Sequence, residues 1–193
     1  MQSRDYSRMY VIGPPGAGKG SLCTKFASEY GYHHLSVGDL LRFLCHLETL
    51  RPDIVKKIQT NALVSIEDLV PILHNVIETL KLEGKERFLI DGVPRVIDQA
   101  VPVEEAIGSP DLVLFFNCPG KIAKERFLTR KISGRVDDGE TFDKRYRQYV
   151  EENARIVEYY RNRGLLVEVD TSGDVDVSYG KLVEGLRGRG WKG

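Results

Sequence analysis

A glycine-rich segment constrains the fold of this chain more than any other feature. Gly13-Pro-Pro-Gly-Ala-Gly-Lys-Gly-Ser21 follows the short apolar run of residues 9–12 and precedes an amphipathic stretch, residues 22–30. A loop of this kind between a strand and a helix directs successive backbone N–H groups into one cavity, where the helix dipole adds positive potential. We therefore predict a phosphate-binding loop, in which Lys19 reaches the terminal phosphates and the Ser21 hydroxyl is available to Mg²⁺.

Apolar runs and amphipathic stretches alternate along the rest of the chain. The apolar runs predict strands, the 3.6-residue periodicity predicts helices, and their alternation predicts a parallel α/β sheet with helices on both faces. Residues 132–141 are polar and predict a loop, and the glycine-rich tail, residues 185–193, is expected to fray. Ser65-Ile-Glu-Asp68 resembles a capping box. The predicted strands are 9–12, 33–35, 88–91, 112–116 and 165–169. The predicted helices with both ends given are 22–30, 39–50, 119–129 and 142–163. Two further helices are predicted to begin at Pro52 and at Ser65, and a short one is predicted to close at residues 103–107.

Composition and charge exclude several classes of protein. A length of 193 residues suits one domain, and no apolar run approaches the roughly 20 residues of a membrane span. The 28 basic and 28 acidic residues balance, which argues against a nucleic-acid binder. Cys23, Cys45 and Cys118 show no metal-ligand spacing, and residues 1–8 lack the apolar core of a signal peptide. We expect a cytoplasmic protein with reduced thiols, with the nucleus as a second location, and neither a nucleic-acid nor a membrane partner.

Five motifs in order resemble those of nucleoside monophosphate kinases. In the loop, Gly20 stands between the lysine and the hydroxyl, as in the G-x-P-G-x-G-K-G-[ST] pattern of that family. The other four are HLSVGDLLR at 34–42, FLIDGVPR at 88–95, SGRVDD at 133–138 and DTSG at 170–173. The resemblance covers about residues 9–185, and the segments 98–100 and 114–119 look closest to fungal-type UMP/CMP kinases.

The family resemblance implies an architecture and a reaction. It implies a doubly wound P-loop kinase: one domain, residues 1–193, with a five-stranded parallel sheet, a helical acceptor-binding insert near 36–65 and a short lid near 131–141. The implied reaction moves the γ-phosphoryl group of Mg-ATP to a nucleoside monophosphate, UMP or CMP first and AMP as the alternative. The implied protein is a monomer that works on small nucleotides.

The resemblance also assigns roles to residues. Phosphoryl transfer needs fixed cations and no general base, because the accepting phosphate is already ionised. The positions implied for catalysis are Lys19, Arg95, Arg130, Arg135 and Arg145. Those implied for ATP are Gly16, Ala17, Gly18, Lys19, Gly20, Ser21, Arg126, Arg130 and Gly173. Those implied for the acceptor are Val37, Arg42, Ala62, Leu63, Val64, Gly92, Val93, Pro94, Arg95, Gln99, Arg135 and Arg145. Ser21 and, through water, Asp91 would hold Mg²⁺, and Asp137 and Asp138 resemble lid carboxylates that pair with arginines or the donor.

The acceptor base is read from fewer residues. Val37 stands where adenylate kinases carry Thr and UMP/CMP kinases tend to carry Ala, so the hydroxyl is missing and a pyrimidine is favoured. Gln99 occurs in both branches and does not decide. The chain departs from the family at Asn61-Ala-Leu-Val-Ser65, at Val93 before the proline, at Gly139 and in a shortened lid. The base pocket and the lid are therefore the segments that differ most from the family pattern.

Two rival functions remain beside this one. A P-loop kinase for a small hydroxyl acceptor, such as gluconate or shikimate, would need a general base and fewer arginines. A nucleotide-binding regulatory module with little turnover is suggested by the departures in the base pocket and opposed by Lys19 and the five phosphate-facing arginines. We interpret His33 and His34 as structural, and the aromatic face of residues 142–163, which includes Tyr146 and Tyr149, as core.

Overall fold

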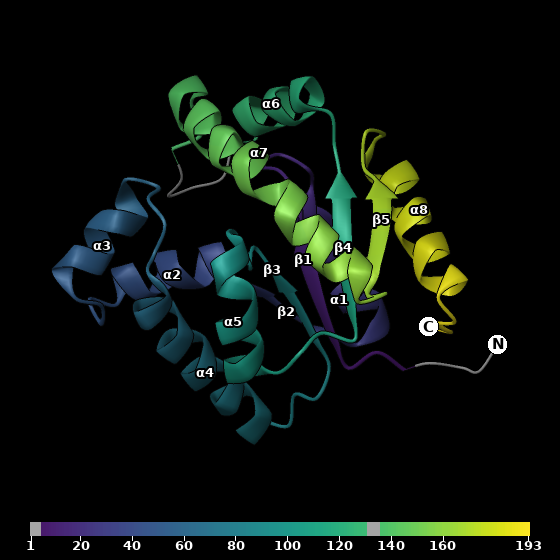
Figure 1. Ribbon diagram of the computed structural model, residues 1–193, viewed down its shortest axis with the longest axis horizontal. Coiled ribbons are helices and arrows are strands. Elements are labelled where there is room, and N and C mark those ends of the chain that lie inside the picture. Colours follow the sequence, from purple (N-terminus) through teal and green to yellow (C-terminus); the bar gives the residue numbers. More distant parts are fainter. Residues whose placement is uncertain (1–4, 131–135) are drawn as a thin grey trace.

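Five parallel strands form the centre of the molecule, as predicted. The computed structural model describes residues 5–130 and 136–193 (Figure 1). The strand order is β2-β3-β1-β4-β5, and Tyr10 in the central strand pairs with Ile90 on one side and Val113 on the other. The strands are β1 (Arg8–Ile12), β2 (His33–Ser36), β3 (Phe88–Asp91), β4 (Leu112–Asn117) and β5 (Leu166–Asp170).

Helices cover both faces of the sheet. Alternate residues of β1 point to opposite faces, so Met9 and Val11 pack with α1 and α8, whereas Tyr10 and Ile12 pack with α4, α5 and α7. Helices α2 and α3 project with their connecting loops at the β2 edge of the sheet (Figure 1). The helices are α1 (Lys19–Tyr30), α2 (Val37–His46), α3 (Pro52–Gln59), α4 (Ile66–Leu82), α5 (Ala100–Ile107) preceded by the short turn η1 (Ile97–Gln99), α6 (Gly120–Thr129), α7 (Gly139–Asn162) and α8 (Val175–Gly188).

Several helix boundaries differ from the prediction. Helix α1 begins at Lys19 instead of residue 22, and α2 begins at Val37 instead of residue 39. Helix α2 ends at His46 instead of residue 50, and Glu48 just beyond it adopts a positive φ of 54°. Helix α7 begins at Gly139, three residues before the predicted start, because the Asp138 side chain caps it by accepting a hydrogen bond from the backbone N–H of Thr141 (2.8 Å). Residues 139–141 are therefore helical and do not belong to a loop.

The prediction of a fraying tail is wrong. Helix α8, which the sequence patterns did not indicate, runs through Gly188, and Leu186 within it is fully buried. Trp191 is 3% exposed, and its ring lies 5.2 Å from that of Phe26 and 4.6 Å from that of Tyr30. Aromatic packing on α1 therefore outweighs the flexibility of the tail glycines.

The predicted capping box at Ser65 also forms differently. Ser65 is the N-cap of α4, but its hydroxyl donates to the Asp68 carboxylate (2.7 Å) and accepts no backbone N–H. In the ranges that the structure describes, no helix has both the length and the apolar character needed to cross a membrane.

Candidate active site

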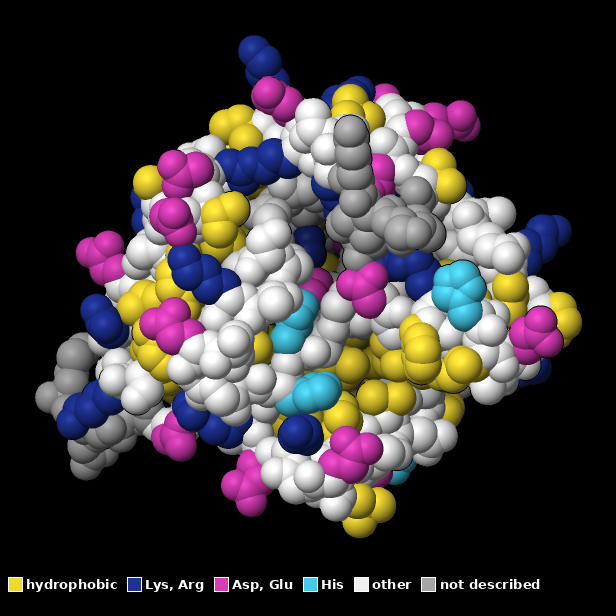
Figure 2. Space-filling view, turned by 180° about the vertical axis from the view of Figure 1, so that it is seen from behind, with side chains coloured by type: hydrophobic (Ala, Val, Ile, Leu, Met, Phe, Trp, Pro, Cys, Tyr) yellow, Lys and Arg dark blue, Asp and Glu magenta, His cyan; other side chains and the backbone are white. Residues whose placement is uncertain are grey.

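A large cleft opens at the carboxyl ends of the strands. Its volume is about 1500 Å³, and its lining comes from the phosphate loop, α1, α2, α6, α7 and the β5–α8 connection. This is the edge at which parallel α/β sheets bind ligands. Of the described residues that line it, seven are Lys or Arg and three are Asp, although the whole chain has no net charge. Figure 2 shows basic and acidic side chains interspersed over the visible face of the molecule.

The phosphate loop fits tightly against α6. Gly16 has a φ of +84°, and a Cβ atom built there would lie 2.0 Å from the carbonyl oxygen of Ala123. Gly18 also has a φ of +84° and directly precedes α1. At Gly16 an L side chain would meet both backbone strain and the fixed carbonyl of Ala123, whereas at Gly18 the positive φ alone favours glycine. The loop thus holds its N–H groups at the α1 N-terminus in one shape.

The ammonium group of Lys19 lies over this loop. It donates to the carbonyl oxygens of Gly13 and Pro14, both at 2.8 Å. Burial lowers the pKa of Lys19 to about 8; Asp91 opposes this shift, and Arg145 and Arg95 add to it. A cation held near other cations in a low-dielectric site is stabilised by an incoming anion.

Arg42 and Arg95 converge from α2 and from the loop after β3. A Cβ atom on Gly38 would lie 3.3 Å from Arg42 Nη2 and 3.5 Å from Arg95 Nη2, so both guanidinium groups reach the same place. Arg95 Nε donates to the Gly92 carbonyl (3.2 Å), and Arg42 donates to the Asp39 carboxylate (2.5 Å). Burial, and after it the neighbouring Arg42, lower the pKa of Arg95. The pair suits a doubly charged phosphate.

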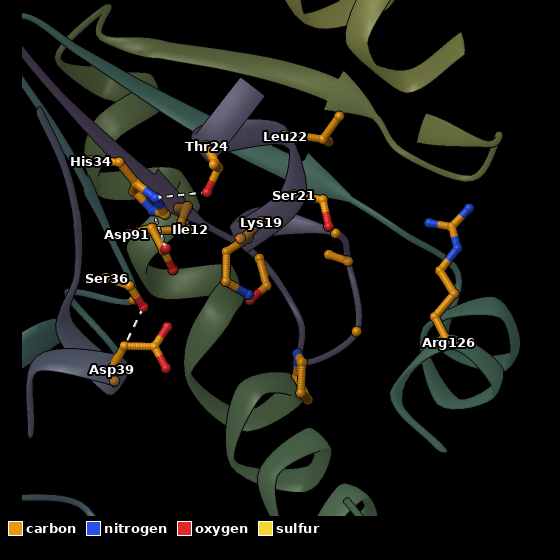
Figure 3. A pocket seen from close by; sticks show the side chains of 18 of the residues that line it. Ile12, Lys19, Ser21, Leu22, Thr24, His34, Ser36, Asp39, Asp91 and Arg126 are labelled. Carbon is orange, nitrogen blue, oxygen red and sulfur yellow. Dashed lines mark hydrogen bonds and ion pairs between the residues drawn. The ribbon is translucent and has the colours of Figure 1, made fainter. Parts of the chain in front are cut away.

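Arg126 fastens the β5–α8 connection to α6. Its guanidinium donates to the carbonyl oxygens of Thr171 (2.6 Å), Ser172 (3.1 Å) and Gly173. Both Arg126 and Gly173 line the cleft. Figure 3 shows Arg126 on the opposite side of the loop from His34 and Asp91, so the cleft has two ends.

The described residues beside the expected lid make three kinds of contact: an ion pair, a helix cap and the lining of the cleft. Arg130 makes a two-pronged ion pair with Asp137, with distances of 2.7 and 2.6 Å, as the resemblance implied. Asp138 caps α7, and in the described chain no hydrogen bond or ion pair joins it to an arginine. Arg145 lines the cleft, with its guanidinium carbon 5.7 Å from the centre of the Phe127 ring. Arg135 and residues 131–134 of the expected lid lie outside the described residues.

A smaller cavity beside the main cleft contains most of the residues expected at the acceptor. Gln99 is 1% exposed and accepts a hydrogen bond from the backbone N–H of Arg95 through Oε1 (2.9 Å), which leaves its NH₂ group as a donor. Val93 lines neither cavity and is fully buried in the core, whereas Pro94 lines the main cleft. The expected residues in the smaller cavity are Val37, Arg42, Ala62, Leu63, Val64, Gly92, Arg95, Gln99 and Arg145.

The remaining expected donor residues lie along the main cleft. Gly16, Ala17, Gly18, Gly20 and Ser21 all line it. Asp91, at the end of β3, is 6% exposed and also lines it. The hydroxyl and the carboxylate are oxygen donors of the kind that Mg²⁺ prefers.

His34 and Tyr149 are two of the cleft residues that sequence reasoning did not assign to the site. His34 donates a hydrogen bond from Nε2–H to the Asp91 carboxylate (Nε2–Oδ2 2.7 Å) and lines the cleft. Tyr149 on α7 is only half-buried and lines the cleft as well, so the aromatic face of α7 is not entirely core. The signal for His34 was its position two residues before the end of β2, beside the strand that ends in Asp91.

Comparison with known proteins identifies the family of this chain. The model of the adenylate kinase family matches residues 11–165. The uridylate kinase of Saccharomyces cerevisiae is 36% identical over 94% of this chain and 91% of its own length. The UMP-CMP kinase of Lentinula edodes is 36% identical over 87% of this chain and 80% of its own length. Adenylate kinase isoenzyme 1 of Sus scrofa is 36% identical over 87% and 88%, so identity alone does not choose the acceptor.

Proposed function

Because this chain belongs to the adenylate kinase family of nucleoside monophosphate kinases, we propose that it transfers the γ-phosphoryl group of Mg-ATP to UMP or CMP. The observation that supports this most is the convergence of Lys19, Arg42 and Arg95 on one cleft behind a phosphate loop. AMP is the second candidate acceptor, because the adenylate kinase isoenzyme matches at the same identity.

The donor nucleotide would occupy the end of the cleft between the phosphate loop and Arg126. The N–H groups of residues 16–21 would bind the β- and γ-phosphates, and Lys19 would exchange its loop carbonyls for phosphate oxygens. Arg126 and Gly173 would line the adenine. Ser21 and, through water, Asp91 would hold Mg²⁺, which neutralises charge on the β- and γ-phosphates when bound.

The acceptor would occupy the other end of the cleft. Arg42 and Arg95 would bind its phosphate in a fork, and Arg130 and Arg145 would face the transferring group, together with Arg135 from the lid. One oxygen of the acceptor phosphate forms a bond to the γ-phosphorus while the bond from that phosphorus to the bridging oxygen breaks. The bridging oxygen keeps the electron pair and leaves as part of ADP, so no proton has to move and the protein supplies position and charge.

The choice of a pyrimidine rests on the smaller cavity. Val37 is 2% exposed, lines that cavity and offers no hydroxyl to a base. The Gln99 amide offers its NH₂ group as a donor, because its oxygen already accepts a hydrogen bond from the Arg95 backbone. Uracil, cytosine and adenine each carry an acceptor for the Gln99 NH₂ group, so Gln99 does not distinguish the three bases. The preference for UMP or CMP therefore rests on Val37.

Water would be excluded by closure of the acceptor-binding insert and the lid. We assign the acceptor-binding insert to residues 36–65 and the lid to residues 131–141, of which 139–141 form the first turn of α7, within one domain of residues 1–193. Closure prevents hydrolysis of ATP while the acceptor phosphate is in place. We further propose that the protein works as a monomer, because the described residues of one chain already supply both ends of the cleft. Its proposed substrates are free nucleotides, and its proposed location is the cytoplasm.

The test is UMP- or CMP-dependent formation of ADP in four variants. Lys19→Met and Arg95→Ala should each lower turnover at least about 10²–10³-fold, since each removes charge from the reacting phosphates. Lys81→Met and Arg161→Ala remove exposed cations outside the cleft and should behave like the parent protein. Near-parental turnover in Lys19→Met or Arg95→Ala, or ADP formation that does not depend on a pyrimidine monophosphate, would overturn the proposal.

A further inference from the structure

Three side chains of metal-ligating type meet at the floor of the cleft. They are Cys23 of α1, His34 of β2 and Asp91 of β3, and one ligand atom from each lies within 4.8 Å of the other two. No other group of three His, Cys, Asp or Glu side chains among the described residues meets this condition. Phosphoryl transfer uses the carboxylate alone, so the thiol and the imidazole have no part in the proposed reaction.

The fold places these groups together through strand register and helix packing. Ser36 pairs with Asp91 and His34 with Leu89 in the parallel β2–β3 ladder, so the side chains of His34 and Asp91 share one face. Helix α1 covers that face and brings the fully buried Cys23 sulfur behind them. His34 and Asp91 line the cleft, with side chains 15% and 8% exposed, so a cation can arrive from the nucleotide side.

His34 is held by a hydrogen bond at each ring nitrogen. Nε2 lies 2.7 Å from the Asp91 carboxylate, and Nδ1 lies 3.3 Å from the Thr24 hydroxyl (Figure 3). In the neutral imidazole Nε2–H donates to Asp91 and Nδ1 accepts from Thr24. A metal ion that replaces the proton between Nε2 and the carboxylate needs that proton to move to Nδ1. The Thr24 hydroxyl oxygen can then accept a hydrogen bond from Nδ1–H. Metal-bound histidines are usually oriented by a hydrogen bond of this kind from the ring nitrogen that does not bind the metal.

We propose that Cys23, His34 and Asp91 bind a thiophilic divalent cation, represented by Zn²⁺, when the cleft is free of nucleotide. One sulfur, one nitrogen and one oxygen donor suit Zn²⁺, with water from the cleft as the fourth ligand, whereas Mg²⁺ demands oxygen donors. The bound cation occupies the Asp91 carboxylate and so inhibits phosphoryl transfer; this part rests on the proposed function.

Charge balances in this site without any redox change. The Cys23 thiol loses its proton to solvent, the imidazole stays neutral, and the thiolate and the carboxylate together neutralise the divalent cation. Burial and the Asp91 carboxylate raise the pKa of the Cys23 thiol, so the proton stays until the metal displaces it, while the nearby Lys19 acts in the opposite direction.

The binding test uses Co²⁺, whose bond to a thiolate gives an ultraviolet charge-transfer band. The reduced full-length protein without nucleotide should develop this band, and Cys118→Ala, which removes another buried free thiol, should keep it. Cys23→Ala should abolish the band, and His34→Gln should weaken Co²⁺ binding about 10–100-fold while the circular dichroism spectrum is retained. Absence of the band in the parent protein, or its persistence in Cys23→Ala, would overturn the site.

The inhibition test measures ADP directly by chromatography, with UMP and Mg-ATP as substrates, so that no coupling enzyme is exposed to Zn²⁺. Zn²⁺ should inhibit the parent protein and Cys118→Ala equally, and Cys23→Ala should need at least about 10-fold more Zn²⁺. Equal inhibition of all three proteins would overturn the inhibitory role. If the proposed acceptor were wrong, turnover with UMP would be missing while the Co²⁺ band remained, so the two failures are distinguishable.

Discussion

Replacement of Gly16 by alanine tests the architecture of the phosphate loop. The new Cβ atom would lie 2.0 Å from the carbonyl oxygen of Ala123, in backbone of α6 that cannot rotate away. Ordinary van der Waals contact begins at 3.4 Å, so the loop and α6 must separate by about 1.4 Å. The same separation displaces the N–H groups that we assign to the phosphates of ATP.

The cost has two parts. A left-handed conformation costs a residue with a Cβ about 1–2 kcal/mol. Forcing an extra methyl group into a packed site costs about 1–3 kcal/mol. Gly16→Ala should therefore lower the free energy of unfolding by about 2–5 kcal/mol, a large part of the roughly 5–15 kcal/mol that a domain has. ATP affinity should fall in the same variant.

The matched control is Gly180→Ala. Gly180 lies within α8 and nothing lies within 4 Å of its added Cβ. That variant should be more stable than the parent by about 0.5–1 kcal/mol, because alanine is the better helix former. Urea unfolding can be followed by the fluorescence of Trp191, the one tryptophan of the chain, and ATP binding by calorimetry. A Gly16→Ala protein with parental stability and ATP affinity would refute the close loop–helix contact.

Three further predictions address the acceptor, the lysine and the core. Val37→Thr should raise the AMP to UMP ratio of kcat/KM by about 2- to 12-fold, the equivalent of one net hydrogen bond of about 0.5–1.5 kcal/mol; an unchanged ratio would show that this position does not read the base. Since burial lowers the pKa of Lys19 from 10.5 to about 8, the phosphate-binding ammonium is lost as pH rises. The kcat/KM for ATP should therefore fall above about pH 8. The unfolded chain keeps the Lys19 proton up to about pH 10.5, so the free energy of unfolding should rise between about pH 8 and 10.5. A free energy of unfolding that varies with pH as it does in Lys19→Met, together with a kcat/KM for ATP that stays constant above about pH 8, would contradict the lowered pKa of Lys19. Glu104→Gln should lower the free energy of unfolding by about 1.5–3 kcal/mol, because it replaces a buried carboxylate that accepts two hydrogen bonds from Arg163, at 2.6 and 2.9 Å; parental stability in urea would show that the pair contributes nothing.

Local patterns were sufficient for the sheet. Each predicted strand is present within a residue or two. Strands β1, β3 and β4 are buried along almost their whole length and leave apolar runs in the sequence, whereas the edge strand β5 alternates buried and exposed residues. The loop before Lys19 was equally legible, since glycines at fixed spacing are required by its backbone. Both features depend on residues close together in the chain.

Contacts between residues far apart in the chain could not be predicted from the sequence. Trp191 is ordered by Phe26 and Tyr30, about 160 residues earlier, and no local pattern in a glycine-rich tail indicates that contact. His34 reaches Asp91 only because β2 pairs with β3, so its position near the end of a strand becomes informative only once that pairing is known. Asp138 could cap a helix, pair with an arginine or do both, and the cap is evident only from the observed start of α7.

One competition experiment tests the central claim directly. The parent protein is supplied with ATP labelled in the γ-phosphoryl group and with equal amounts of UMP, CMP and AMP, and the label is followed into each diphosphate. The ratio of labelled products reports the ratio of kcat/KM values, and ADP derived from the donor carries no label. We predict more label in UDP and CDP than in ADP. Label that enters mainly ADP would contradict the pyrimidine assignment, and label that enters none of the three would contradict the kinase reaction itself.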